Sequence, residues 1–260
     1  MFAIFKQWRL LFRMVERDLR SKYVGSLVGV FWTVVNPLLL LLVFTFIFAV
    51  IFRARFGTES RVSVSALYIL CGLIPWLGFQ EGVARSASYL LENRNLVSRV
   101  KFPVQVLPAV PVLSAFLGQL VGFVILLVWA GAKGKLHLPA ALFLPVWMVL
   151  QIGFGLGLGY LFSAAGVWVR DLIQLIPVLL LVWMYATPIF YPASLVPERF
   201  QAVVWINPIA ALVNGYRRMI LEGTMPSLNQ CLFLATAAAI SLAIGAAAFS
   251  NLKKGIADRV

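Results

Sequence analysis

The sequence has few charged residues and very few acidic ones. Only 12% of its 260 residues are charged and nine are Asp or Glu, whereas about a quarter of the residues in ordinary soluble domains are charged. Hydrophobic residues make up 62% of the chain. Six stretches contain at most one charged residue, and each is long enough for the roughly 20 apolar residues of a membrane-spanning helix. We therefore expect an integral membrane protein.

Residues that carry catalysis or bind metals are also scarce. There is one histidine, His137, and the two cysteines, Cys71 and Cys231, lie in apolar stretches that favour neither a disulfide framework nor a metal site. The sequence lacks a G-x-x-x-x-G-K-[ST] phosphate loop and the H-E-x-x-H, C-x-x-C and G-x-S-x-G patterns. The connections between the apolar stretches are too short for a soluble catalytic domain. We expect no enzyme activity and no bound cofactor, so a partner must supply any energy from ATP.

The positive charge of the chain suggests contact with lipid. The net charge is +13, which in a soluble protein would suggest nucleic acid. In a membrane protein, Lys and Arg in loops set the orientation and meet anionic lipids, so we expect no nucleic acid as a partner. Glu81 is the main acidic residue in an apolar stretch, which argues against a chain of intramembrane proton carriers.

The first 24 residues predict an amphipathic helix in the cytoplasmic membrane interface. Its apolar positions have helical spacing, and its basic positions fall on the other side, as in helices that lie in the plane of the interface. The alternative is a solvated terminal helix. The apolar set is Trp8, Leu11, Phe12, Val15 and Leu19, and the basic set is Lys6, Arg9, Arg13, Arg17 and Arg20.

The whole chain, residues 1–260, predicts a single all-α transmembrane domain with six transmembrane helices. Residues 25–190 contain spans one to five, and residues 229–260 contain span six and a cytoplasmic tail. The six spans cover about residues 25–52, 65–90, 105–130, 138–169, 172–190 and 229–251.

Details of the spans support their packing as helices. Asn36-Pro37 predicts a kink in the first span. Glu81 and Arg85 are four residues apart, so one turn of helix allows them to pair. Small residues four apart, Gly153 with Gly157 and Gly155 with Gly159, favour close approach of a neighbouring helix.

Residues 191–228 predict two short helices on the outer side. The 17 uncharged residues 200–216 are broken at Asn207-Pro208. A continuous helix would cover only about 26 Å, short of the roughly 30 Å hydrocarbon core. We expect the segment to dip into the membrane and return, bordering a pathway as a gate. The gate candidates are Pro197, Asn207, Pro208, Asn214, Arg217 and Arg218, with the two arginines held by lipid phosphates or a partner's carboxylate.

The distribution of basic residues predicts that both termini are cytoplasmic. With six spans, thirteen Lys or Arg residues fall on the inner side and eight on the outer side. This bias agrees with the excess of positive charge on cytoplasmic segments. A seventh span would remove the bias.

Three stretches resemble one known family. They are "RDLRSKYVGSLVGVFWTVVNPLLLLLVFTFIF" at residues 17–48, "NLVSRVKFPVQVLP" at residues 95–108, and the segment from "TPIFYP" to "INPIAALVNGYRRMILEG" at residues 187–223. In order and spacing they are similar to the interface helix with first span, the coupling loop and the outer gate helices of ABC transporter membrane subunits. These subunits export bacterial cell-surface polysaccharides, namely O-antigen, capsule and teichoic acid.

The resemblance implies a homodimer in the bacterial inner membrane with two copies of a separate ATPase subunit, which binds ATP and Mg²⁺. By this likeness, the first and fifth spans would line a channel for a polyprenyl-linked polysaccharide of the O-antigen class. A coupling helix at about residues 92–103 would dock on the ATPase. The lining candidates are the aromatic residues Phe31, Trp32, Phe44, Phe48, Trp183, Tyr185, Phe190 and Tyr191. The coupling candidates are Arg94, Leu96, Val97, Arg99 and Lys101.

Two other functions remain open at the level of sequence. One is an ABC permease of similar architecture that exports a drug or a lipid. The other is a membrane protein without a transport role, such as an assembly scaffold or an intramembrane enzyme. The first would leave surface glycan intact when the gene is deleted, and the missing catalytic residues argue against the second.

Overall fold

The structure is a computed structural model that describes residues 7–22, 31–44, 46–47, 62–97 and 102–259. These residues are helical or in connecting turns, with no β-strand among them. The predicted all-α class is confirmed. The helices are α2 (Trp8–Ser21), α3 (Trp32–Phe44), α4 (Val62–Glu92), α5 (Arg94–Val97), α6 (Ala109–Ala132), α7 (Leu138–Ala141), α8 (Leu144–Trp168), α9 (Asp171–Ala186), α10 (Glu198–Trp205), α11 (Pro208–Arg217) and α12 (Leu228–Arg259).

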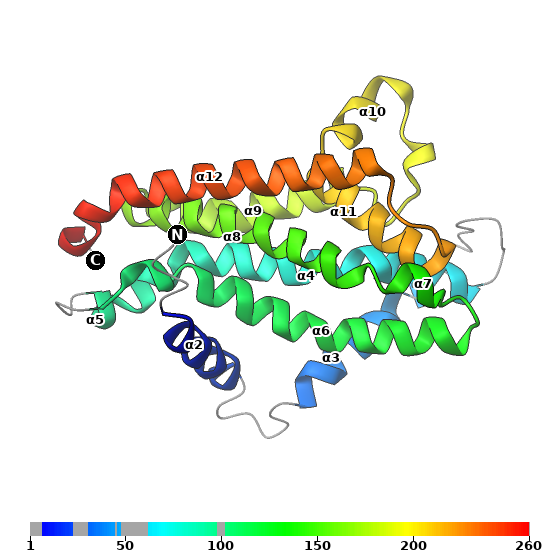
Figure 1. Cartoon of the computed structure of the whole chain (residues 1–260), viewed down its shortest axis with the longest axis horizontal. Helices are drawn as coiled ribbons and strands as arrows, with labels where there is room; N and C mark the ends of the chain where they lie inside the picture. The colour runs from blue at the N-terminus through cyan, green and yellow to red at the C-terminus, as the bar shows by residue number, and fades with distance from the viewer. Residues whose placement is uncertain (1–6, 23–30, 45, 48–61, 98–101, 260) are drawn as a thin grey trace.

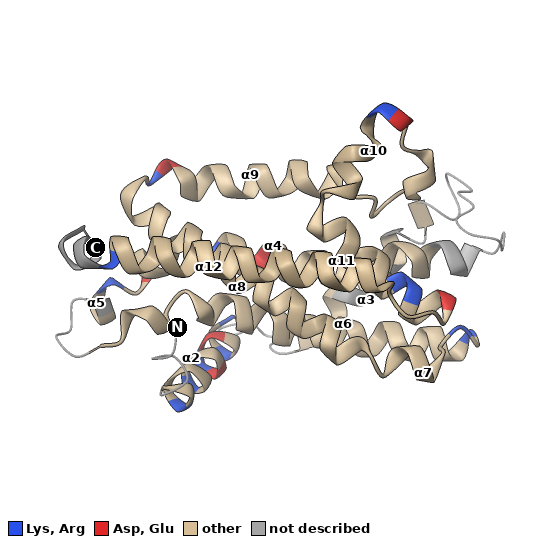
Figure 2. Cartoon of the chain, turned by 45° about the horizontal axis from the view of Figure 1, so that its top comes forward, with Lys and Arg blue, Asp and Glu red and all other residues tan. Residues whose placement is uncertain are grey.

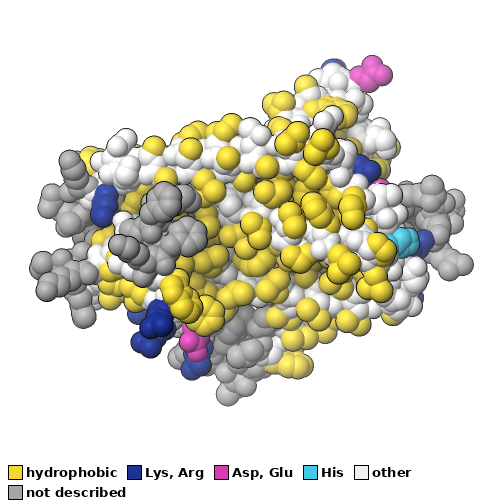
Figure 3. All heavy atoms as spheres, viewed as in Figure 1, with side chains coloured by type: hydrophobic (Ala, Val, Ile, Leu, Met, Phe, Trp, Pro, Cys, Tyr) yellow, Lys and Arg dark blue, Asp and Glu magenta, His cyan; other side chains and the backbone are white. Residues whose placement is uncertain are grey.

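The long helices form an elongated bundle. In Figure 1, α4, α6, α8, α9 and α12 run along the long axis, and α2 lies beside one end of α6. The α5 segment and the C-terminal end of α12 are at one end of the bundle, whereas α7, α10 and α11 are at the other. Charged residues gather at the two ends and on α2 (Figure 2). Hydrophobic side chains cover much of the side of the bundle that Figure 3 shows, as a surface facing lipid requires.

Four helical segments within the described residues are long and apolar enough to cross a membrane. They are Ala66–Glu92, Val104–Ala132, Leu138–Trp168 and Leu228–Lys253. They coincide with predicted spans two, three, four and six. The fifth, α9, has 16 residues, which cover about 24 Å. Only residues 31–44 and 46–47 of the first span are described, so the count of six spans stays a prediction.

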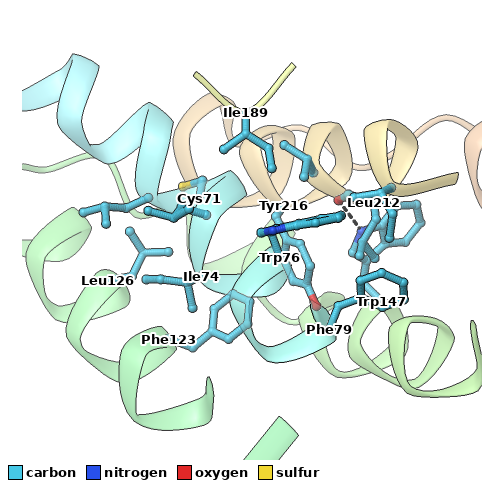
Figure 4. Packing of buried hydrophobic residues seen from close by; sticks show 14 of the residues in the cluster. Cys71, Ile74, Trp76, Phe79, Phe123, Leu126, Trp147, Ile189, Leu212 and Tyr216 are labelled. Atoms are coloured by element: carbon cyan, nitrogen blue, oxygen red, sulfur yellow. Dashed lines mark hydrogen bonds between the residues drawn. The ribbon is translucent and has the colours of Figure 1, made fainter. Parts of the chain in front are cut away.

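The core of the bundle is built around large aromatic side chains. Trp76, Trp147, Tyr216 and Phe123 are almost completely buried, and Figure 4 shows them converging from α4, α8, α11 and α6. Trp147 Nε1 donates a hydrogen bond to the Leu212 carbonyl at 2.9 Å. The rings of Phe123 and Tyr216 lie 4.9 Å apart between centroids. Although α11 is short, these contacts fix it within the bundle.

Small residues bring α8 and α12 together, as their spacing predicts. A Cβ added at Gly157 would collide with the backbone of Ser241 and Leu242 on α12. A Cβ added at Gly245 would in turn collide with the backbone of Gly157. The two backbones are therefore in direct contact, which only the absence of side chains allows. The predicted close packing at Gly157 is confirmed.

Candidate functional site

A charged cluster fastens α2 to α4. The Arg85 guanidinium donates two hydrogen bonds to Asp18, at 2.9 and 2.8 Å. The Lys22 ammonium lies 2.6 Å from the Glu81 carboxylate. The Arg85 guanidinium lies 3.8 Å from the Glu81 carboxylate. The predicted pairing within α4 is therefore present, but its distance is longer than those of the contacts that Arg85 and Glu81 make with Asp18 and Lys22. The forked contact between Arg85 and Asp18 is the geometry in which such pairs are strongest.

Asp18 is the buried member of this cluster, with 5% of its surface exposed. Burial raises the pKa of the Asp18 carboxyl, but the hydrogen bonds and charge of Arg85 and the charge of Lys22 outweigh this effect and hold the pKa below its ordinary value. Sequence reasoning missed the role of Asp18. The available signal was an acidic residue three positions after Val15 and four after Met14, a spacing that places it on the same face of the helix as these two apolar residues.

The apolar side of α2 has two surroundings. Met14 and Val15 are buried against the bundle, whereas Trp8 and Phe12 are each 61% exposed. Exposed aromatic side chains next to basic residues are typical of helices in a membrane interface. The predicted interfacial position of α2 agrees with this pattern and stays a prediction, because no bilayer is present.

Two glutamines in the apolar interior join four helices, α4, α6, α8 and α11. Gln151 Nε2 donates to the Pro75 carbonyl at 3.0 Å and to Gln119 Oε1 at 2.9 Å. The Tyr216 hydroxyl donates to Gln151 Oε1 at 2.7 Å. A Cβ at Gly78 would overlap the Gln119 side chain, so this glycine makes room for the network. The sequence signal was a single side-chain amide within each of the apolar helices α6 and α8, and our sequence analysis did not use it.

The break between α10 and α11 is held by Asn207. Helices α10 and α11 are separate and meet at Asn207-Pro208, as predicted. Asn207 Oδ1 accepts from the Ile209 and Ala210 amides at 3.0 and 3.4 Å and thereby caps α11. It also accepts from Trp183 Nε1 at 2.9 Å, and Asn207 Nδ2 donates to Thr187 Oγ1 at 2.9 Å. The re-entrant course of these helices stays a prediction.

Arg217 differs from the expectation that it would reach lipid phosphates or a partner's carboxylate. It is 4% exposed, and its guanidinium lies 3.6 Å from the centroid of the Tyr68 ring. It donates to the Tyr68, Pro188 and Ile189 carbonyls at 3.1, 2.7 and 2.7 Å. These carbonyls satisfy the guanidinium in the interior, so Arg217 joins α11 to α4 and to the chain after α9.

The remaining gate candidates lie around the same segment. Pro197 precedes α10, and Pro208 is the first residue of α11, a position that tolerates the missing N–H of proline. Asn214 is exposed on α11. Arg218 donates to Thr224 Oγ1 and to Gln230 Oε1, each at 3.3 Å. The candidates thus share one end of the bundle, and their gating role stays a prediction.

The predicted lining residues occupy different environments. Trp183 is half-buried and makes an edge contact with Phe79 at 5.8 Å between centroids. Phe31 and Trp32 near the start of α3 and Tyr185 on α9 are exposed, whereas Phe190 and Tyr191 are half-buried. Phe44 ends α3, and Phe48 lies outside the described residues. Their role in lining a channel stays a prediction.

The predicted coupling segment begins with α5. Arg94 is exposed, and Leu96 is partly buried against the second core cluster. Val97 ends the helix, and Arg99 and Lys101 lie outside the described residues. The α5 helix is at the same end of the bundle as the C-terminal end of α12 (Figure 1). Docking on an ATPase stays a prediction.

Comparison with known proteins gives consistent matches along the chain. The ABC-2 type transporter family matches residues 9–221. The O-antigen export system permease protein RfbA of Myxococcus xanthus is 29% identical over 253 residues, which cover 96% of this chain and 95% of that protein. RfbA of Klebsiella pneumoniae is 26% identical over 250 residues, with 96% and 94% covered. The polysialic acid transport protein KpsM of Escherichia coli is 23% identical over 241 residues, with 92% of each covered. Together with the apolar helical bundle, the match over most of its length shows that the chain belongs to the ABC-2 type transporter family.

Proposed function

We propose that the chain is the channel-forming permease subunit of an ATP-driven exporter, which moves a polyprenyl-linked polysaccharide of the O-antigen class from the cytoplasm to the periplasm across the bacterial inner membrane. Two copies of the chain form the channel, and two copies of a separate ABC ATPase hydrolyse ATP. The observation that carries this proposal is the similarity to two O-antigen export permeases over 96% of the chain.

The chemistry of the described residues supports a transport role. Within them, no group of three or more His, Cys, Asp or Glu residues is placed to hold a metal ion. The polar residues of the interior instead bond to one another and to backbone carbonyls, as in Gln119, Gln151 and Arg217. Such contacts hold helices together and provide no nucleophile or general base. Movement of a polymer requires a pathway and an energy source, and α5 is the segment that we assign to contact with the ATPase.

Deletion of the gene in its source bacterium tests the proposal. The deletion strain should lose its surface polysaccharide and accumulate lipid-linked polymer on the cytoplasmic side of the inner membrane. Both effects are measured by gel analysis of surface glycan and by extraction of the lipid-linked pool. A plasmid copy of the gene should restore export. Replacement of Leu96 by Asp in that copy should leave the protein in the membrane but reduce export, because a buried charge would displace α5.

The same experiment decides between polysaccharide and other cargo. If the deletion strain keeps its surface polysaccharide but becomes sensitive to a drug or loses a surface lipid, then the chain serves an exporter of that cargo. A deletion strain with normal glycan, drug resistance and lipid would contradict a transport role.

A further inference from the structure

A cavity lies between α10, α11 and the start of α12, at the end of the bundle that we expect to be the outer one. Its volume is about 770 Å³, within the range of about 300 to 1,000 Å³ that small-molecule sites occupy. Figure 1 shows these three elements at the end of the bundle opposite α5. We propose that this cavity binds a saccharide unit of the exported polymer after it has crossed the membrane; the identity of this ligand rests on the proposed function.

The floor of the cavity is rigid and electrically balanced. Arg217 lines the cavity with only 4% of its surface exposed, so we take it as the floor, and its three hydrogen bonds to carbonyls hold it in place. The Glu222 carboxylate lines the same cavity. One positive and one negative side chain, with the positive one already bonded to carbonyls, favour a neutral ligand over phosphate or another anion.

The walls of the cavity offer amide groups. Asn214 and Asn229 line it from α11 and α12, and neither side chain has a hydrogen-bond partner within the described residues. An amide presents both a donor and an acceptor. Two such groups on different helices can therefore bond to neighbouring hydroxyls of a sugar ring, each of which also donates and accepts.

The rim of the cavity supplies an aromatic face. Trp205 ends α10, lines the cavity and is 78% exposed. A pyranose ring has an apolar C–H face that packs on an aromatic ring, while its edge carries hydroxyl groups. The combination of one exposed indole, unpartnered amides and a balanced floor matches this ligand better than it matches a fatty acyl chain, which would leave the amides without partners.

A binding experiment on the purified protein tests the site. The protein is placed in nanodiscs, because detergents with sugar headgroups would compete for the cavity. The probe is the oligosaccharide that mild acid releases from the surface glycan of the source strain, and binding is measured by saturation-transfer NMR. The wild type should bind it, and Trp205→Ala and Asn214→Ala should each raise the Kd about tenfold, as expected for one lost contact of about 1.4 kcal/mol.

Phe200→Ala is the matched control, because Phe200 is an exposed aromatic residue on the same helix that does not line the cavity. It should bind the probe as the wild type does. The proposal is overturned if the wild type does not bind the probe, or if Phe200→Ala loses as much affinity as Trp205→Ala. It is also overturned if brominated lipids quench the fluorescence of Trp205, because the indole would then face lipid. The fluorescence of Trp205 is obtained by subtracting that of the Trp205→Phe variant from that of the wild type. If the plasmid copy restores surface glycan but the purified protein binds no saccharide, the cavity is not a saccharide site and the proposed function still holds. A chain that binds the probe but whose deletion leaves glycan export intact would contradict the proposed function alone.

Discussion

Among single residues, Asp18 and Arg85 show how a helix outside the bundle is held against it. Asp18 is buried on α2, and Arg85 reaches it from α4 with 31% of its side chain exposed. Removal of one partner from a buried pair costs more than the pair itself contributes, because the other charge is left without compensation. The partial exposure of Arg85 reduces this cost.

Replacement of Arg85 by Gln should lower the free energy of unfolding by roughly 2 kcal/mol, less than the roughly 3 to 5 kcal/mol of a fully buried pair. Unfolding of the purified protein in nanodiscs by heat or denaturant measures the change. The double variant Asp18→Asn with Arg85→Gln should recover much of the loss. Arg20→Gln is the control, because the Arg20–Glu16 pair is exposed, and it should have little effect. Equal effects of Arg85→Gln and Arg20→Gln would contradict a special role for the Asp18 pair.

The same pair predicts a dependence on pH. The pKa of Asp18 in the folded protein is below the ordinary value of 3.8, so its charged form favours the docked state. This contribution is present at pH values above about 4 and is lost as the pH falls through the lowered pKa of the folded state. A fluorophore on a cysteine at Arg13 should therefore report release of α2 only below about pH 4. In Asp18→Asn the signal should not change over that window, and a wild-type transition near neutral pH would rule out Asp18 as its cause.

At the scale of helices, direct backbone contact joins α8 to α12. Gly157→Ala places a methyl group where the α12 backbone lies, and overpacking of this kind costs about 1 to 3 kcal/mol. We expect a lower melting temperature for this variant. Gly118→Ala is the control, since a Cβ at Gly118 meets no atom within 4 Å, and it should melt at or above the wild-type temperature because alanine favours helix. A Gly157→Ala variant as stable as Gly118→Ala would show that the two backbones are not in contact.

The sequence predicts helices better than it predicts what their side chains contact. Apolar stretches mark the long helices, and Asn207-Pro208 marks the break between α10 and α11, because both signals are local. Asp18 and Arg85 are 67 residues apart, and no periodicity indicates such a pair. Arg217 was expected to meet lipid phosphates or a partner's carboxylate, and arginine is rarely fully buried unless it is paired. Its actual partners are backbone carbonyls, which the sequence does not distinguish from any others.

For the molecule as a whole, orientation in the membrane is the central expectation. If residues 191–228 stay on the outer side, then cysteines at Gln201 and Asn214 should both react with an impermeant thiol reagent added from the periplasm, after Cys71 and Cys231 are replaced. A cysteine at Arg94 should not react, because α5 is at the opposite end of the bundle. Reaction at Gln201 but not at Asn214 would place a crossing between them and contradict six spans.

The four bonds of Asn207 also restrict how the protein moves. This one side chain connects α9, through Trp183, to the chain after α9, through Thr187, and to the first turn of α11. If α9 shifts along its axis, the start of α11 must travel with it, or a buried amide must give up partners that no water replaces. A displacement that begins at the Asp171 end of α9 should therefore reach the end of the bundle that carries α10 and α11. There α9 and α11 would move together, without a change in how the two helices pack on each other.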